Sequence, residues 1–229
     1  MKETDIQGVR ELIAEAMRFR FACKEYDPTR KISEEDFQCI LEAGRLSPSS
    51  FGFEPWKFLV VENAELRDAI KSVSWGTQTQ MPGASHFLVI LARKPAAMSP
   101  DSDYIRKTIM IETQNFPEDV RAFRTQKYAT FLASDFALAG NERACFEWAA
   151  RQCYIAIGNM FTAAAMLGID SCPCEGFQKE PLETLLAERG ILDRDVYGVA
   201  CMASFGYRKE PPKRPKTRRP MDQVVEWLK

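Results

Sequence analysis

The chain has 229 residues, of which 45% are hydrophobic, 11% aromatic and 28% charged. This is the composition of a globular protein, and it excludes collagen-like chains, low-complexity disorder and small disulfide scaffolds. The 31 Lys and Arg nearly balance the 32 Asp and Glu, which leaves a net charge of −1. We therefore expect neither nucleic acid nor a membrane surface as a partner.

The sequence gives no sign of targeting or of membrane insertion. Residues 1–5 are polar and lack the apolar stretch of a signal peptide. The most apolar long segment, 153–169, is shorter than the roughly 20 residues that a spanning helix needs. The seven cysteines are odd in number and mostly lie in apolar segments, as reduced thiols do. We expect a cytoplasmic protein without a transmembrane helix.

The first part of the chain mixes helical and extended patterns. Ser33 and Asn63 each precede a segment with helical spacing and are favourable N-cap residues. A continuous apolar run beginning at His86 is typical of a buried strand. The predicted elements are helices over 6–17, 33–44 and 63–73 and strands over 56–61 and 86–92.

The second part is dominated by helices. Residues 102–136 are helical and amphipathic, with a break near Pro117. The longest helical segment, 141–167, is apolar on nearly every face after its first turn, so it needs cover on all sides and indicates a subunit interface. A further helix over 181–190, a strand over 196–205, a base- and proline-rich segment over 206–220 and a short helical tail complete the chain. Because helices outnumber strands and do not alternate strictly with them, we predict an α+β fold.

The common nucleotide, triad and metal signatures do not occur. No strand is followed by G-x-G-x-x-G, and there is no G-x-x-x-x-G-K-[ST]. The single histidine, His86, lies in an apolar strand and is interpreted as a core residue. Cys172 and Cys174 are the only close cysteine pair and make a poor zinc signature. We expect no metal site.

Several segments carry groups that could bind a ligand, although each alone has a plain structural explanation. Five positive charges stand at Lys213, Arg214, Lys216, Arg218 and Arg219 between prolines, which suits either a phosphate or a solvated tail. The loop 47–52 offers hydroxyls, and Gln78 and Gln80 offer amides, but these are also ordinary turn and surface residues. The segment 172–177 is interpreted as a loop in which Gly176 permits close backbone approach.

Taken together and in order, six motifs resemble those of the FMN-dependent nitroreductase family. Arg20-Phe21-Ala22-Cys23-Lys24-Glu25-Tyr26 is similar to its motif R-x-S-x-[KR]-x-[FY]. Ser47-Pro48-Ser49-Ser50, followed by Pro55-Trp56-Lys57-Phe58, is similar to S-P-S-x…Q-P-W-x-F. The others are Ala84-Ser85-His86, the helix from Trp148 to Gly158-Asn159, Pro173 with Glu175-Gly176-Phe177, and Pro215-Lys216 with Arg218 and Pro220. The resemblance covers roughly residues 10–220.

The resemblance implies where FMN would lie. Arg20, Lys216 and Arg218 would hold the phosphate, and Lys24 would lie near the pyrimidine edge of the flavin ring. The backbone N–H of Glu175 would face flavin N5. Pro48, Ser49 and Ser50 would reach the flavin of the opposite subunit. The full set of expected cofactor-binding residues is Arg20, Phe21, Ala22, Lys24, Pro48, Ser49, Ser50, Gly52, Gln78, Gln80, Pro173, Cys174, Glu175, Gly176, Lys216 and Arg218.

The resemblance also implies a fold and an activity. It implies a three-layer α+β domain over 1–229, with a mostly antiparallel central sheet flanked by helices, and an intertwined homodimer. Residues 206–229 would form a cofactor-contacting loop and a tail. FMN would pass hydride from NAD(P)H to nitroaromatic, quinone or related acceptors by a ping-pong mechanism. No side chain is expected as a catalytic acid or base, because the flavin carries the chemistry.

Three alternatives stay open at this point. The first is a specialised enone, flavin or dihydropteridine reductase of the same family. The second is a non-catalytic flavin-binding protein, and the third is a thiol-redox protein that uses Cys172 and Cys174. The sequence also departs from the family pattern. Ala22 replaces a common Ser, Gly52 a frequent Asn, Glu54 the usual Gln, and Gln80 a second Lys of some relatives, so Lys24 would be the only positive charge at the pyrimidine edge.

Overall fold

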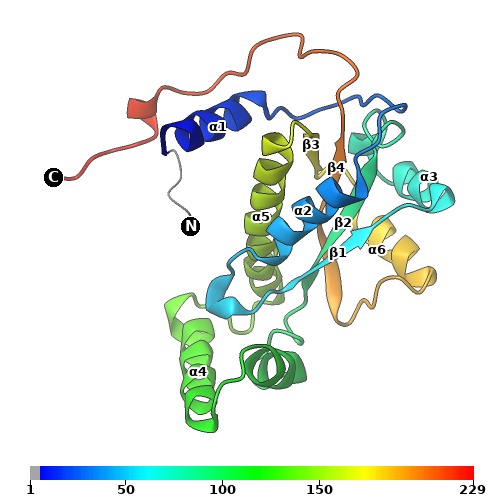
Figure 1. Cartoon of the computed structure of the whole chain (residues 1–229). Helices are drawn as coiled ribbons and strands as arrows, with labels where there is room; N and C mark the ends of the chain where they lie inside the picture. The colour runs from blue at the N-terminus through cyan, green and yellow to red at the C-terminus, as the bar shows by residue number, and fades with distance from the viewer. Residues whose placement is uncertain (1–5) are drawn as a thin grey trace.

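The computed structural model describes residues 6–229, and within them four strands form one antiparallel sheet (Figure 1). The strands lie in the order β1-β2-β4-β3, so β2 and β4 are central and β1 and β3 are edges. All three strand pairs are antiparallel. The strands are β1 Trp56–Val60, β2 His86–Arg93, β3 Asp170–Cys174 and β4 Tyr197–Gly206.

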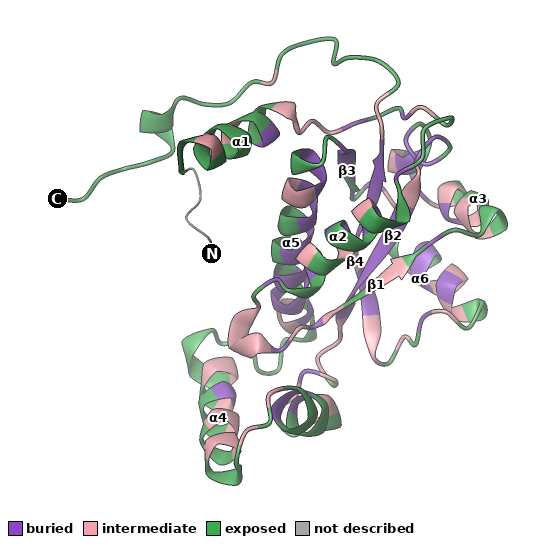
Figure 2. Cartoon of the chain, in the orientation of Figure 1, coloured by how far each residue is buried: buried purple, intermediate pink, exposed green. Residues whose placement is uncertain are grey.

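Helices cover both faces of this sheet and make it the middle of three layers. α2 and α5 share one hydrophobic core with the sheet, and α3 and α6 share a second core on the opposite face (Figures 1 and 2). The predicted three-layer α+β architecture is therefore confirmed. The helices are α1 Ile6–Phe19, α2 Glu34–Arg45, α3 Ala64–Ser72, α4 Glu118–Thr130, α5 Glu142–Met166 and α6 Lys179–Glu188, with π-helical stretches at Tyr104–Thr113 and Phe131–Asp135.

Local sequence signals explain where these elements begin. Ser33 Oγ accepts a hydrogen bond from Asp36 N at the start of α2, and Asn63 Oδ1 accepts one from Leu66 N at the start of α3. Asn141 caps α5 in the same way. The residues of β2 from Phe87 to Ala92 are fully buried, as expected of a central strand that is covered on both faces. The N-cap and strand predictions for these segments are confirmed.

Strand β3 differs from the sequence prediction, which expects a loop over 172–177. The strand has five residues and contains Pro173, which cannot donate a backbone hydrogen bond. It pairs with β4 alone in the strand order, and an edge strand tolerates a proline that a central strand would not. The predicted helical tail is also shorter than expected, since it forms a single 3-10 turn at Met221–Gln223.

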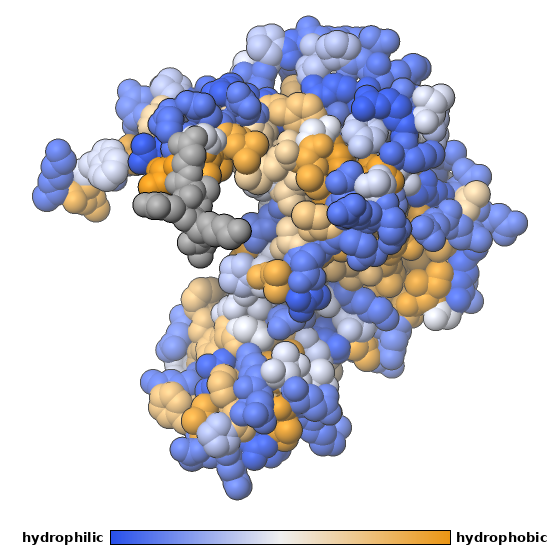
Figure 3. Space-filling view, in the orientation of Figure 1, coloured by the Kyte–Doolittle hydropathy of each residue, from blue (hydrophilic) through white to orange (hydrophobic). Residues whose placement is uncertain are grey.

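Helices α1 and α5 keep apolar side chains at the surface of this single chain. On α5, Tyr154, Ile155 and Met166 are exposed, as is Leu167 just after the helix. On α1 the exposed residues are Ile6, Val9, Leu12, Ile13 and Met17, and apolar atoms are visible along this helix (Figure 3). α1 packs against α5 but does not cover it. A single chain therefore leaves part of the apolar surface of α5 exposed to solvent. No helix in residues 6–229 is long and apolar enough to cross a membrane.

An ion pair next to β3 fixes the chain that leaves the sheet. Asp170 is buried and Oδ2 accepts hydrogen bonds from Arg208 N at 2.9 Å and Arg208 Nε at 3.0 Å. Arg208 Nη2 also donates to Phe19 O at the end of α1. These bonds hold three parts of the chain together and direct the segment after β4 back toward α1.

Replacing this buried carboxylate should destabilise the fold. We expect Asp170→Asn to lower the free energy of unfolding by about 2–4 kcal/mol, because the largely buried Arg208 guanidinium would lose its charge partner. Urea unfolding followed by circular dichroism at a fixed protein concentration measures this. The matched control is Glu25→Gln, which removes the exposed pair with Lys209 and should leave the midpoint unchanged. Equal shifts in the two variants would contradict the assigned role.

Candidate active site

A cavity of about 530 Å³ lies at the β3 edge of the sheet, and we call it the edge cavity. Four parts of the chain form its walls: the segment that carries Lys24, the end of β3 with the residues after it, one face of α5 and the turn after α3. Its lining residues are Lys24, Trp75, Gly76, Gln80, Tyr154, Ile157, Gly158, Phe161, Pro173, Cys174, Glu175 and Gly176. On α5 these residues recur three and four apart, so a single helix face forms the apolar wall.

Two backbone segments meet closely at one end of the edge cavity. Gly76 N donates to Gly176 O at 2.7 Å. A Cβ atom on Gly176 would lie 2.8 Å from Gly76 Cα, and a Cβ atom on Gly76 would lie 3.0 Å from Cys174 Sγ. Gly176 therefore requires glycine, and Gly76 leaves little room for a larger residue. The contact brings the backbones of Gly76 and Gly176 together at the cavity wall.

Lys24 carries the positive charge of the edge cavity. Its Nζ donates to Cys172 Sγ at 3.3 Å. In the described chain no ion pair joins Lys24 to a carboxylate. The carboxylate of Glu175, which also lines the cavity, instead accepts a hydrogen bond from the Tyr154 hydroxyl. The ammonium of Lys24 is therefore available to a negatively charged group in the cavity.

Tyr154 is held in its protonated form. Although Tyr154 is partly exposed, the partial burial of its hydroxyl raises the pKa above the usual range, and the nearby Cys201 and Glu175 groups raise it further. The pKa of the Cys174 thiol is also raised, mainly by burial. The lining of the edge cavity thus includes a neutral phenol, a neutral thiol, one ammonium group and the carboxylate of Glu175.

Gln80 and Gln78 are both expected to offer amide groups to a ligand, but their side chains lie in different surroundings. Gln80 is buried, donates from Nε2 to Gly76 O at 2.5 Å and accepts a hydrogen bond from Ser204 Oγ at 2.6 Å. This amide therefore supports the turn at the cavity wall. Gln78 donates to Lys71 O and Ser74 O, and it is absent from the linings of the cavities described for residues 6–229.

A second, smaller cavity of about 210 Å³ lies where the segment after β4 passes Arg20, and we call it the cationic cavity. Its charged lining residues, among those described, are all basic. The lining consists of Arg20, Phe21, Ala22, Arg214, Pro215, Lys216, Thr217 and Arg218. The pKa of Lys216 is lowered, first by burial and then by the nearby Arg20 and Arg218 charges. The positive charges of these side chains repel one another, and a bound anion would stabilise the cluster.

The structure therefore brings together the three predicted phosphate residues Arg20, Lys216 and Arg218, and it adds a fourth cation. Arg214 belongs to the basic run but does not match the family motif, so its place in this lining has no counterpart among the predicted site residues. Arg219, the neighbour of Arg218, lies outside the lining described for the cationic cavity.

One short segment connects the two cavities. Residues 20–22 line the cationic cavity, and Lys24 lines the edge cavity. Four residues in an extended chain span at most about 14 Å, so a single elongated ligand could occupy both cavities. Between them, Ala22 forms a bridge to Ser171 of β3. The Ser171 hydroxyl is buried and has no hydrogen-bond partner among the described residues.

The loop that carries Pro48, Ser49, Ser50 and Gly52 lies elsewhere. These residues are absent from the described lining of the edge cavity of their own chain. The loop is strained, with positive φ at Phe51, Gly52 and Glu54. Tyr104, Gln114 and Arg124 donate hydrogen bonds to its carbonyl oxygens and hold it in this form.

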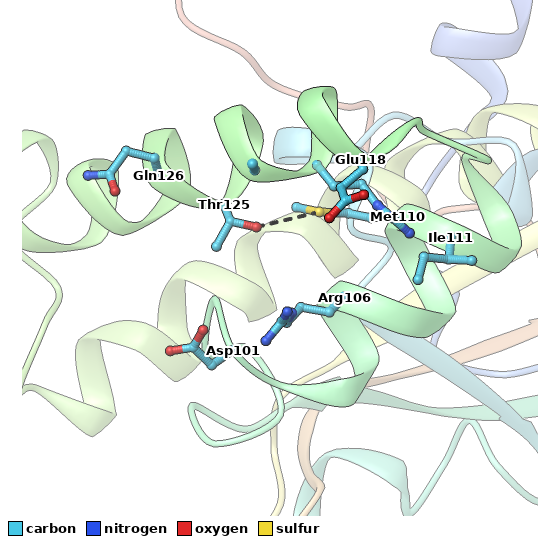
Figure 4. A pocket seen from close by; sticks show the side chains of 9 residues that line it. Asp101, Arg106, Met110, Ile111, Glu118, Thr125 and Gln126 are labelled. Atoms are coloured by element: carbon cyan, nitrogen blue, oxygen red, sulfur yellow. Dashed lines mark hydrogen bonds between the residues drawn. The ribbon is translucent and has the colours of Figure 1, made fainter.

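Another cavity, of about 410 Å³, lies between the helices of residues 101–126 (Figure 4). Arg106 and Asp101 face it together with Glu118, and Thr125 donates to the Met110 sulfur. Acidic and basic lining residues balance, and α4 lies at the end of the molecule opposite β3 (Figure 1). This cavity therefore lacks the excess of positive charge that distinguishes the cationic cavity.

His86 and the cysteines behave as structural residues. The His86 ring stacks on Phe37 with centroids 3.7 Å apart, and burial lowers its pKa. All seven cysteines, which lie within the described residues, are free. No group of three or more His, Cys, Asp or Glu in residues 6–229 could hold a metal ion. With these residues assigned structural roles, the edge cavity and the cationic cavity are the candidate site.

The chain is similar to known proteins in sequence and in fold. The chain is 46% identical over 216 residues to "Putative NAD(P)H nitroreductase YfkO" of Bacillus subtilis, covering 94% of this chain and 97% of that protein. A "putative nitroreductase in complex with FMN" from Exiguobacterium sibiricum has a similar fold, with a TM-score of 0.74 and 21% identity over 94% of this chain and 97% of the other. A gut-bacterial enone reductase, CLA-ER, has a TM-score of 0.73 and 20% identity over 95% and 98% of the two chains. The sequence model of the Nitroreductase family matches residues 17–207, and this chain belongs to that family.

Proposed function

We propose that this protein is an FMN-dependent oxidoreductase that transfers hydride from NAD(P)H to nitroaromatic, quinone or related acceptors. The proposal depends mainly on one observation: residues 20–24 connect the two cavities. One of these cavities is cationic, and the other has both apolar and polar walls. FMN has the matching shape, because a phosphate and a flat ring are joined by a flexible ribityl chain. The names of the relatives support the same activity.

The cationic cavity suits the phosphate of FMN. A phosphate monoester carries nearly two negative charges and three strong acceptor oxygens. Arg20, Arg214, Lys216 and Arg218 offer guanidinium forks and an ammonium around one small volume. In this proposal residues 206–229 form the cofactor-contacting loop and the tail of the single domain.

The space between the cavities suits the ribityl chain. The unpartnered Ser171 hydroxyl lies beside Ala22, at the position where the family commonly has a serine. A buried hydroxyl without a partner is unfavourable, so a hydroxyl of the ribityl chain would satisfy it. We infer that Ser171 replaces the polar contact that Ala22 cannot make.

The edge cavity suits the flavin ring. Ile157 and Phe161 would provide an apolar wall, and the backbone near Glu175 would face the ring edge. When bound, FMN supplies hydride transfer between nicotinamide and acceptor. Lys24 would stabilise the negative charge that develops at the N1–C2=O edge of the ring. The tight contact of Gly76 with Gly176 would orient this backbone and exclude water.

The same cavity also supports enone acceptors as a second candidate. Reduction of an enone needs a proton as well as a hydride, and the Tyr154 hydroxyl lies in the lining of the cavity. One of the similar solved structures is an enone reductase. Turnover across a panel of nitroaromatic, quinone and enone compounds distinguishes the two classes.

We also propose a homodimer. The exposed apolar faces of α1 and α5 need cover, and a second copy would supply it. In this arrangement Pro48, Ser49, Ser50 and Gly52 would reach the partner's flavin, which fits their absence from the described edge-cavity lining of their own chain. The seven free cysteines support a reducing, cytoplasmic location.

The first prediction tests the activity. The purified protein should be yellow, and NADH or NADPH should bleach the flavin absorption in the absence of oxygen. Aerobic turnover should give parallel double-reciprocal plots, as a ping-pong mechanism requires. A colourless protein that takes up no added FMN would overturn the proposal. A bound flavin that neither nucleotide reduces would leave only the non-catalytic flavin-binding alternative.

The second prediction tests the cationic cavity. Arg218→Ala should weaken FMN binding about 10- to 100-fold, because it removes a charge-assisted contact to phosphate. Arg219→Ala is the matched control, since it removes the same charge one residue away, and it should leave affinity nearly unchanged. Fluorescence titration of the apoprotein with FMN measures both. Equal losses would mean that only the diffuse positive charge of the segment matters.

The third prediction tests the homodimer. Ile155→Asp places a charge on the exposed apolar face of α5 and should convert the dimer to a monomer with weakened FMN binding. Phe123→Asp, at an exposed position of α4, is the control and should remain dimeric. Light scattering after size-exclusion chromatography gives the masses. A wild-type monomer that binds FMN normally would contradict this proposal.

A further inference from the structure

Cys172 makes a contact that no family motif predicts. It lies within β3, its side chain is fully buried, and its sulfur is 3.3 Å from Lys24 Nζ. The two residues are 148 positions apart in sequence. The thiol is also 3.3 Å from the carbonyl oxygen of Pro173. Cys172 therefore connects the one ammonium of the described edge-cavity lining to the backbone of its edge strand.

The two contacts give the thiol a defined direction. A thiol has one weak donor and a weakly accepting sulfur. When the S–H group donates to Pro173 O, the sulfur lone pairs are left for the ammonium of Lys24. This orientation is favourable only if the thiol stays neutral. Burial raises its pKa, although the neighbouring Lys24 and Arg20 charges act in the opposite direction.

A neutral sulfur differs from the usual partner of a lysine. A carboxylate at this position would hold Lys24 strongly, but it would also cancel its charge. The sulfur holds the ammonium in place and leaves its charge intact. Glu175, the acidic residue of the described edge-cavity lining, is bonded to Tyr154. Lys24 therefore keeps its full electrostatic effect on a ligand in the edge cavity.

We propose that Cys172 is a positioning residue that holds Lys24 against the edge cavity without neutralising it, and thereby strengthens the stabilisation of negative charge on the bound flavin. This inference rests on the proposed function, because it concerns FMN in the edge cavity. It assigns Cys172 no redox or nucleophilic role, and the thiol-redox alternative gains no support from its burial as a neutral thiol.

A double-mutant cycle on the FMN-loaded protein tests the proposal. The variants are Cys172→Ala, Lys24→Ala and the double variant, and the probe is sulfite. Sulfite donates an electron pair to N5 of oxidised flavin and leaves negative charge at the N1–C2=O edge, so its affinity reports the nearby positive charge without turnover. The midpoint potential of the flavin is the second readout. FMN affinity, measured in parallel, detects simple damage to the site.

We expect Cys172→Ala to weaken sulfite binding about 3- to 10-fold and to lower the potential, with a larger effect for Lys24→Ala. In the Lys24→Ala background, Cys172→Ala should change sulfite affinity less than about twofold, because the interaction is already lost. Cys172→Ser, which retains a donor and an acceptor, should stay near wild type. It also keeps the test decisive if the alanine variant folds poorly.

Cys153→Ala is the matched control. Cys153 is also a buried thiol near backbone carbonyl groups, but it faces β2 and is absent from the described edge-cavity lining. It should leave sulfite affinity and potential unchanged. Equal losses from Cys172→Ala in both Lys24 backgrounds would reduce Cys172 to a packing residue and overturn the inference. That result would leave the proposed function intact, whereas failure to bind FMN at all would overturn the function itself.

Discussion

The edge position of β3 is the constraint on which the rest of the site depends. Pro173 has no backbone N–H, so the outer side of this strand cannot be fully paired by another strand. Only short bridging contacts with residues 22 and 23 occupy it in the described chain. The strand edge therefore opens onto a cavity, and the segment 20–24 runs along it. Asp170 at one end of β3 and Gly176 just beyond the other fix the chain segments that close the two cavities.

Charge is distributed unevenly along this edge. The cationic cavity combines four basic residues with no acidic one in its described lining, which is unfavourable without an anion. The edge cavity has a single ammonium held by a thiol rather than by a carboxylate. A ligand with a strongly negative end and a ring that gains negative charge on reduction matches both. This separation explains how one chain can bind a cofactor tightly and still favour its reduction.

Much of the fold could be predicted from the sequence, because its signals are local. The caps at Ser33 and Asn63, the apolar run of β2 and the length of α5 depend on residues close together in the chain. Strand β3 could not be predicted in this way. It is short, it contains a proline, and its pairing with β4 joins segments about 30 residues apart by register alone.

The site was predictable only where motifs carried it. Arg20, Lys24 and the 173–176 segment were found from their resemblance to a family pattern, and the structure places them around one edge. Arg214, Ser171 and Cys172 were missed because their roles arise from contacts between distant segments, for which the sequence holds no local signal. Gln78 and Gln80 are two similar residues two positions apart, and the sequence alone does not distinguish them. In the structure their side chains donate to different carbonyl oxygens, Gln78 to Lys71 O and Gln80 to Gly76 O.

A crystal structure of the protein grown with FMN is the decisive measurement. We expect the phosphate among Arg20, Lys216 and Arg218 and the ring in the edge cavity, with Lys24 at its pyrimidine edge and Ser171 near the ribityl chain. FMN bound in any other cavity, or with its phosphate away from the cationic cavity, would contradict it.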